Sequence, residues 1–256
     1  MTDAPSPQEV LPAPEPDGAN ARPDRAVLRR ALPYAATAAL ALALVYVVLG
    51  LGGADLRYPL VPIISDYLFG AMVTKSVAVN GWYLTVPQLG APHGLELYDF
   101  PLGDTLHLTA YSVLSLFTKN VALVINLYYL LGFVLIGLTS LFTFRRLRLP
   151  LLPSMSAAML FAFLPHHLQR SEHHAFLSAY YLLPLMCLVL IWAARGTPFL
   201  RSVRTGRIPY RLTSEGSLAL GVCALMGAGG VYYATFGIFL LLWAGLCSCV
   251  RARRWS

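Results

Sequence analysis

The chain has 256 residues, of which 57% are hydrophobic and only 12% are charged. Because a soluble domain normally carries about 25% charged residues, this composition excludes an ordinary soluble globule and predicts a polytopic membrane protein. The net charge of +7 does not indicate a nucleic-acid partner, since the basic residues stand in short clusters between apolar runs, as membrane-topology signals do. We therefore expect an all-α bundle of transmembrane helices that has the lipid bilayer as its main partner.

The N-terminal segment differs from the rest of the chain. Residues 1–24 are rich in Pro, Ala, Asp and Glu and lack apolar periodicity, which predicts a disordered cytoplasmic tail ahead of a transmembrane domain over 25–256. Arginines between positions 22 and 30 then precede an uncharged apolar run over 32–52, which is long enough for one bilayer crossing. These arginines place the start of the run in the cytoplasm.

Six apolar runs are the predicted membrane spans. They cover 32–52, 121–144, 149–164, 175–194, 216–228 and 232–250. With six crossings the basic clusters fall on one side, so both termini are predicted to be cytoplasmic, while the loops over 53–120 and 166–174 face outward. Five spans remain an alternative because the run over 216–228 is short.

The extracytoplasmic loop over 53–120 is predicted to hold two interfacial helices joined by an ordered irregular loop. The first covers 67–80, with Ser65 or Asp66 as its N-cap and an apolar face made of Leu68, Phe69, Met72, Val73 and Val77. The second runs from Asp104 to Leu116, with an apolar face made of Leu106, Thr109, Ala110, Val113 and Phe117. Prolines and glycines between positions 87 and 103 predict the irregular loop.

Carboxylates in this loop are candidate catalytic groups. Asp66 stands at a predicted membrane surface, where partial desolvation raises the basicity of a carboxylate and suits it to deprotonate an acceptor hydroxyl. Asp99 and Asp104 lie near Glu96 and His107, a grouping that could bind a divalent cation or supply an acid and a base. All three aspartates have capping of a helix or a turn as their alternative role.

Two other polar stretches are candidate binding sites, and His93 in the loop is a further candidate. The turn over 166–174 carries Arg170, Glu172, His173 and His174, a composition that suits a phosphate, with a metal site or a solvated interfacial loop as alternatives. The glycine pair at 229–230 precedes Tyr232 and Tyr233, which could stack on or hydrogen-bond a sugar. An aromatic belt at a helix hairpin is the alternative reading.

Several short strings resemble bacterial membrane glycosyltransferases of the GT-C type and the related YfhO-like membrane proteins. They are Gly81-Trp82-Tyr83, Gly90-Ala91-Pro92, Asp99-Phe100-Pro101, Glu172-His173-His174, Ala179-Tyr180-Tyr181, Pro184-Leu185 and Gly229–Tyr233, within the range 58–240. Such enzymes often have adjacent acidic residues in the first loop, whereas Ser65 and Tyr67 flank Asp66 here, so Asp99 or Asp104 would supply a second carboxylate. Because these enzymes usually have more than six spans, the resemblance implies a minimal or truncated relative.

The resemblance implies a function at the outer face of a bacterial plasma membrane. A polyprenyl-phosphate-linked sugar would be the donor, a cell-envelope glycan, lipid or protein the acceptor, and Asp66 the catalytic acid of the first loop. Arg170 or the nearby histidines would contact the lipid phosphate, and a divalent cation is a candidate cofactor. The rival hypotheses are a transporter or flippase for a lipid-linked or small polar substrate, and an accessory subunit of a larger membrane complex.

Overall fold

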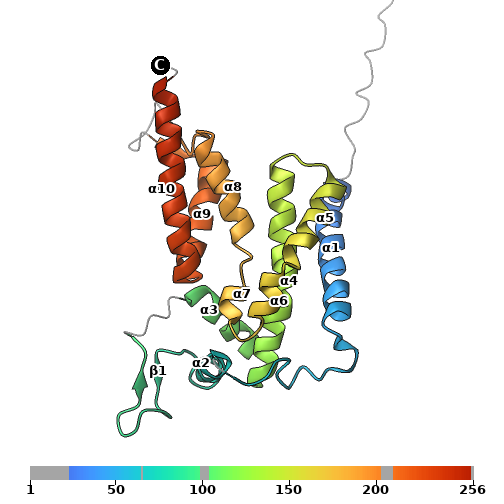
Figure 1. The fold of residues 1–256 in the computed structure, drawn as a ribbon, viewed down its shortest axis with the longest axis vertical. Coiled ribbons are helices and arrows are strands. Elements are labelled where there is room, and N and C mark those ends of the chain that lie inside the picture. Colours follow the sequence, from blue (N-terminus) through green and yellow to red (C-terminus); the bar gives the residue numbers. More distant parts are fainter. Residues whose placement is uncertain (1–22, 65, 99–103, 203–209, 255–256) are drawn as a thin grey trace, which may run out of the picture.

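The computed structural model of the chain describes residues 23–64, 66–98, 104–202 and 210–254 (Figure 1). The tail predicted over 1–24 falls almost entirely outside the described residues, as do the candidates Ser65 and Asp99. The described chain is mainly helical, which confirms the predicted class at the level of a helical membrane protein.

Ten α-helices and two small hairpins make up the described part of the chain. The helices are α1 (Pro23–Val48), α2 (Asp66–Asn80), α3 (Thr105–Ser115), α4 (Val121–Arg146), α5 (Leu151–Ala162), α6 (Pro165–Arg170), α7 (Ala175–Ser178), α8 (Leu183–Ala194), α9 (Ser214–Ala228) and α10 (Val231–Arg254), with a 3-10 turn η1 (Leu51–Gly53). Strand β1 (Thr85–Val86) pairs antiparallel with β2 (Leu95–Glu96), placing Thr85 opposite Glu96, and β3 (Leu200–Ser202) pairs with β4 (Tyr210–Leu212), placing Arg201 opposite Arg211.

Four helical segments are long and apolar enough to cross a membrane: Val27–Val48, Val121–Arg146, Leu151–Arg170 and Val231–Ala252. Two shorter apolar helices, α8 and α9, fall in the other two predicted runs. The fourth predicted run was wrong in its extent, because 175–194 is not one helix: α7 ends at Ser178 and α8 begins only at Leu183. Pro184 lies in the first turn of α8, where its missing amide is tolerated and where it favours a new helix start.

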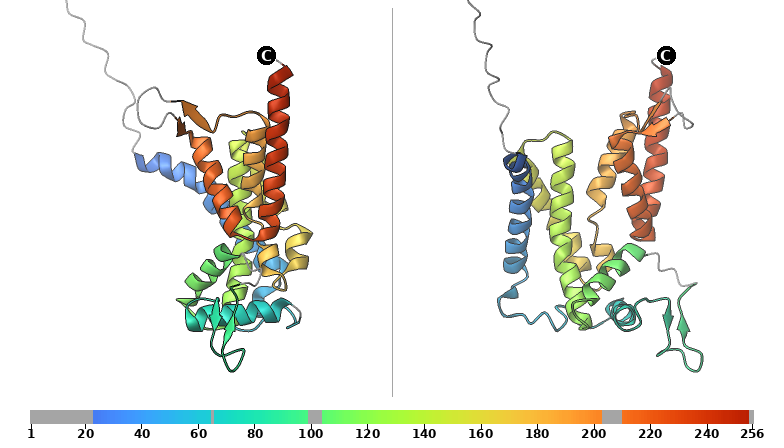
Figure 2. Two further views of the ribbon diagram at one scale, coloured as in Figure 1. Left: turned by 90° about the vertical axis from the view of Figure 1, so that its left-hand side faces the viewer. Right: turned by 180° about the vertical axis from the view of Figure 1, so that it is seen from behind.

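The long helices form two groups that meet at one end (Figures 1 and 2). Helices α1, α4 and α5 pack together, as do α8, α9 and α10, and the short helices α2, α3, α6 and α7 gather at the end where α10 begins (Figure 1). The start of α1 and the C-terminal ends of α4, α8 and α10 lie at the opposite end. The basic residues that follow these ends therefore share one side, while the orientation in a membrane remains a prediction.

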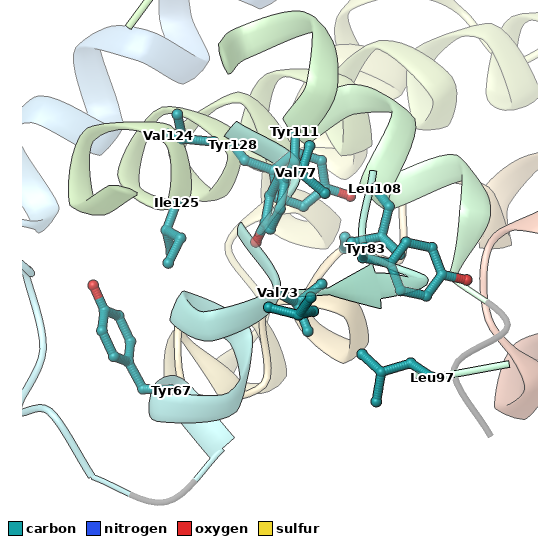
Figure 3. Packing of buried hydrophobic residues seen from close by; sticks show 12 residues of the cluster. Tyr67, Val73, Val77, Tyr83, Leu97, Leu108, Tyr111, Val124, Ile125 and Tyr128 are labelled. Carbon is teal, nitrogen blue, oxygen red and sulfur yellow. The ribbon is translucent and has the colours of Figure 1, made fainter. Parts of the chain in front are cut away.

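The segment over 53–120 folds around a compact apolar cluster (Figure 3). Val73 and Val77 of α2 pack with Leu108 and Tyr111 of α3 and with the first turns of α4. The two predicted helices are present, but the apolar face predicted for α3 was wrong: α3 buries His107, Leu108, Tyr111 and Ser115, whereas Val113 is 50% and Phe117 82% exposed. Because α3 lies between α2 and α4, its contacts select a face that sequence hydropathy alone does not mark.

The segment between α2 and α3 also departs from the prediction of an irregular loop. It forms the β1–β2 hairpin, and Leu97 continues the pairing through a backbone hydrogen bond to Leu84. Amide groups of Asn80, at the end of α2, and Gln88, in the connection between β1 and β2, exchange two side-chain hydrogen bonds of 3.0–3.1 Å. The hairpin is thereby tied to the end of α2.

Candidate functional site

A pocket of about 400 Å³ lies where α2, α3, the turn before α7 and the α9–α10 junction meet. The sequence candidates Asp66, Asp104, Glu172, His173, His174, Tyr232 and Tyr233 all line it. Aromatic rings complete much of the wall, from Tyr67, Phe69, Tyr111 and Phe176. Segments that are far apart in the sequence therefore contribute to one cavity.

Asp66 is held at the rim of the pocket by a side-chain contact with His174. The Nδ1 atom of His174 lies 3.0 Å from Oδ2 of Asp66, and the aspartate side chain is 63% exposed. Asp66 is the first residue of α2 rather than the N-cap residue that precedes the helix. Its negative charge in the first turn is favourable at the helix N-terminus. In this geometry Nδ1–H of His174 donates to the carboxylate and fixes its direction.

His173, next in the chain to His174, is engaged in positioning rather than free to bind a ligand. Its Nε2 atom lies 3.0 Å from the carbonyl oxygen of Pro62, and its Nδ1 atom lies 3.1 Å from Oγ of Ser171. The tautomer that satisfies both contacts has Nε2–H donating to Pro62 and Nδ1 accepting from the serine. The imidazole thus ties the turn at 171–174 to the segment that leads into α2.

Asp104 precedes α3 and faces the glycine pair at the α9–α10 junction. Its side chain does not cap α3, so capping of this helix is not its role in the structure. Burial raises the pKa of the Asp104 carboxyl to about 6. Gly230 has a φ of +116°, and a Cβ at this position would come within 2.8 Å of Oδ1 of Asp104. The glycine therefore leaves room for the carboxylate at the pocket wall.

Glu172 is the most deeply buried acid of the pocket, with 2% of its surface exposed. Burial raises the pKa of its carboxyl to about 7, an effect that the nearby backbone amide of Leu60 partly offsets. Even so, neither carboxylate oxygen has a partner in full hydrogen-bond geometry among the described residues. Burial and the charge of Glu172 together raise the pKa of Tyr67 to about 12, and they also raise that of Tyr111, so both phenols lie close to this carboxylate.

His107 is a central residue that the sequence marks only as a neighbour of the Asp99 and Asp104 candidates. Its buried ring accepts or donates on both sides: Nε2 lies 2.6 Å from the carbonyl oxygen of Gly229, and Nδ1 contacts the hydroxyl of Tyr128. It also stacks on Phe176 with ring centroids 5.0 Å apart and an interplanar angle of 10°. Burial lowers its pKa to about 4, and the Gly229 bond opposes this effect. No local pattern identifies such a residue, because Gly229 is 122 positions away.

Two of the described sequence candidates, His93 and Arg170, do not line the pocket. His93 lies exposed in the β1–β2 hairpin, and Asp99 is outside the described residues. Arg170 is exposed, although its guanidinium lies within electrostatic range of the Tyr233 hydroxyl. That hydroxyl donates to the carbonyl oxygen of Leu177 at 2.5 Å and lies 3.4 Å from Nε2 of His166. Arg170 is therefore placed near the rim formed by α10.

The predicted metal site is not preformed in the part of the chain that the structure describes. No group of three or more His, Cys, Asp or Glu side chains there has a geometry that could hold a metal ion. The lining carboxylates belong to different segments, and His173 and His174 already contact other groups. What the site offers chemically is carboxylates of different basicity beside aromatic rings.

Comparisons with protein-family models, with curated proteins and with solved structures find no match to this chain. The GT-C resemblance read from the short strings therefore stays a prediction, and the pocket has to be interpreted from its own geometry.

Proposed function

We propose that the protein is an integral-membrane glycosyltransferase that moves a sugar from a polyprenyl-phosphate carrier to a cell-envelope acceptor. The observation that supports it most directly is the pocket, in which Asp66, Asp104 and Glu172 stand among aromatic rings at the end of an apolar helix bundle. Aromatic faces and carboxylates suit a sugar, whose ring has apolar faces and hydroxyl donors. The position beside membrane-crossing helices gives a lipid carrier access.

In the proposed reaction Asp66 acts as the general base. The acceptor hydroxyl gives its proton to the Asp66 carboxylate while its oxygen forms a bond to the anomeric carbon of the sugar. The bond from that carbon to the carrier phosphate oxygen breaks, and the polyprenyl phosphate leaves with the bonding electron pair. His174, which donates to Asp66 across 3.0 Å, orients the carboxylate.

Arg170 and His166 are the proposed contacts of the carrier phosphate at the rim of the pocket. Arg170 is exposed there and lies in electrostatic range of the Tyr233 hydroxyl, while His166 is 3.4 Å from the same hydroxyl. A guanidinium can bind phosphate oxygens in a bidentate manner, and a protonated imidazole adds a further donor. The donor would thus place its phosphate at the α10 rim and its sugar in the pocket.

The test is transfer of radiolabelled sugar from polyprenyl-phosphate hexoses by the full chain reconstituted in lipid vesicles. Asp66→Asn is expected to lower transfer at least about 100-fold, the size of a typical general-base contribution. Asp55→Asn is the matched control, since Asp55 is an exposed aspartate of the same loop that does not line the pocket. Full activity in Asp66→Asn would remove Asp66 from the mechanism. Movement of the lipid-linked sugar across the vesicle without a new glycosidic bond would favour the flippase.

A further inference from the structure

The described lining of the pocket contains acidic side chains without a lysine or arginine to match them. It contains three carboxylates, from Asp66, Asp104 and Glu172, and neither lysine nor arginine. Only Asp66 has an imidazole paired with it, at 3.0 Å. Two carboxylates are thus left for which the described lining supplies no cationic partner, and buried charges in proteins are normally paired.

Glu172 is the acid of this lining whose missing partners are best defined. It lines the pocket, is 2% exposed, and has no partner in hydrogen-bond geometry for either oxygen among the described residues. An unsatisfied buried acid destabilises the fold unless a ligand supplies the missing donors. Apart from the nearby backbone amide of Leu60, the described residues supply no donor to this carboxyl at the wall of the cavity.

Aromatic side chains line the same pocket as Glu172. Tyr67 and Tyr111 lie close enough to Glu172 for its charge to act on their hydroxyls, and Tyr111 also lies within electrostatic range of Asp104. Phe176 packs against Tyr111 with ring centroids 5.4 Å apart. A carboxylate among aromatic faces is an environment that binds an ammonium group, because the carboxylate pairs with it and the ring faces attract it.

We propose that the pocket recognises a substrate that carries a primary ammonium group, specifically an amino sugar, and that Glu172 is the residue that binds this group. The inference rests on the proposed function in taking the ligand to be a sugar. It adds that the sugar is cationic, and it separates Glu172, which selects the substrate, from Asp66, which accepts the proton. Asp104, which lines the same pocket and also lies within electrostatic range of Tyr111, contributes further negative potential.

Binding of small sugars to the full chain in detergent micelles tests this assignment at neutral pH. The probes are D-glucosamine, D-glucose and N-acetyl-D-glucosamine. They share a ring, but only glucosamine is charged and the other two are neutral. We expect glucosamine to bind about tenfold more tightly than either neutral sugar, as measured by titration with saturation-transfer NMR. Equal affinities for the three sugars in the wild-type chain would overturn the proposal without any variant.

Two variants locate the effect. Glu172→Gln is expected to bring the affinity for glucosamine down to that for glucose, whereas the control Glu96→Gln, on an exposed acid of β2, is expected to keep the preference. A preference retained in folded Glu172→Gln would overturn the role of Glu172. Should that variant fail to fold, Asp104→Asn is expected to weaken the preference, and an unchanged preference there would count against the proposal. Mn²⁺ that binds alone and displaces glucosamine would assign the acids to a metal ion instead.

The same sugars separate this inference from the proposed function. Transfer of neutral sugars with no preference for glucosamine would support the proposed glycosyltransferase activity and overturn the ammonium site. Preferential binding of glucosamine, with no transfer from any polyprenyl-phosphate sugar, would support the ammonium site and remove the transferase.

Discussion

Replacing His107 by phenylalanine is expected to loosen the contact between α3 and the group of helices α8, α9 and α10. The imidazole is 1% exposed and links α3 to the carbonyl of Gly229 at 2.6 Å and to the hydroxyl of Tyr128. Phenylalanine keeps the ring that stacks on Phe176 but has neither nitrogen. His107→Phe therefore removes the polar contacts while leaving no cavity.

The expected cost follows from the two groups that lose their partner. A buried polar group left unsatisfied costs about 1–3 kcal/mol. The hydroxyl of Tyr181 lies 3.5 Å from the His107 Nδ1 and is a neighbour of Tyr128, so it can take over part of the tyrosine's bonding. The Gly229 carbonyl has no comparable substitute, and the total loss is expected to be about 2–4 kcal/mol of unfolding free energy.

Denaturant unfolding of the purified chain in mixed micelles measures this loss. His93→Phe is the matched control, because His93 is exposed in the β1–β2 hairpin and makes none of these buried contacts. A surface substitution of this kind is expected to change stability by less than about 0.5 kcal/mol. Equal unfolding midpoints for His107→Phe and His93→Phe would refute the idea that this imidazole joins the two parts.

Two further predictions concern the pocket wall. Gly230→Ala is expected to lower the unfolding free energy by about 1–3 kcal/mol, because φ is +116° and the added Cβ would lie 2.8 Å from Oδ1 of Asp104. Gly221→Ala in α9 is the control, because nothing lies within 4 Å of the added Cβ, and it is expected to stabilise the helix slightly. Thermal unfolding measures both variants. Similar losses of stability in the two would contradict this reasoning. Because the Glu172 pKa is raised from 4.5 to about 7, the folded chain binds more protons than the unfolded chain between these values, so the contribution of Glu172 to stability falls as pH rises. Glu172→Gln is expected to remove this fall in denaturant titrations across that range, and an unchanged pH slope would show that Glu172 is not buried in this way.

Most of the polar residues that line the pocket were selected from the sequence because charged and glycine-rich strings are conspicuous in an apolar chain. Asp66, Asp104, the 172–174 turn and the tyrosines after Gly230 were selected from their types and positions, and the fold brings them to one pocket. Apolar run length likewise predicted the positions of the four segments that are long and apolar enough to cross a membrane. Both signals are local, so a single sequence is sufficient to find them.

Features that depend on packing were not predictable in the same way. The buried face of α3 is chosen by α2 and α4, which leaves Phe117 exposed and encloses His107. The break between α7 and α8 lies inside a continuous apolar run, where hydropathy carries no signal. The partner of His107 is 122 residues distant, and such pairings follow from the arrangement of helices rather than from any periodicity.

The position of the pocket has a mechanical consequence. Helices α2 and α3 are packed on α4, whereas Gly229 and Gly230 belong to the junction of α9 and α10, so the cavity spans the contact between the two helix groups. His107 bonds across this contact, and Asp104 approaches Gly230 closely within it. A small rotation of α8–α10 against α4 would therefore move Tyr232 and Tyr233 relative to Asp66 and change the width of the pocket. A ligand that touches both walls would favour one arrangement of the groups, and it would bind most tightly where the His107 bond is intact.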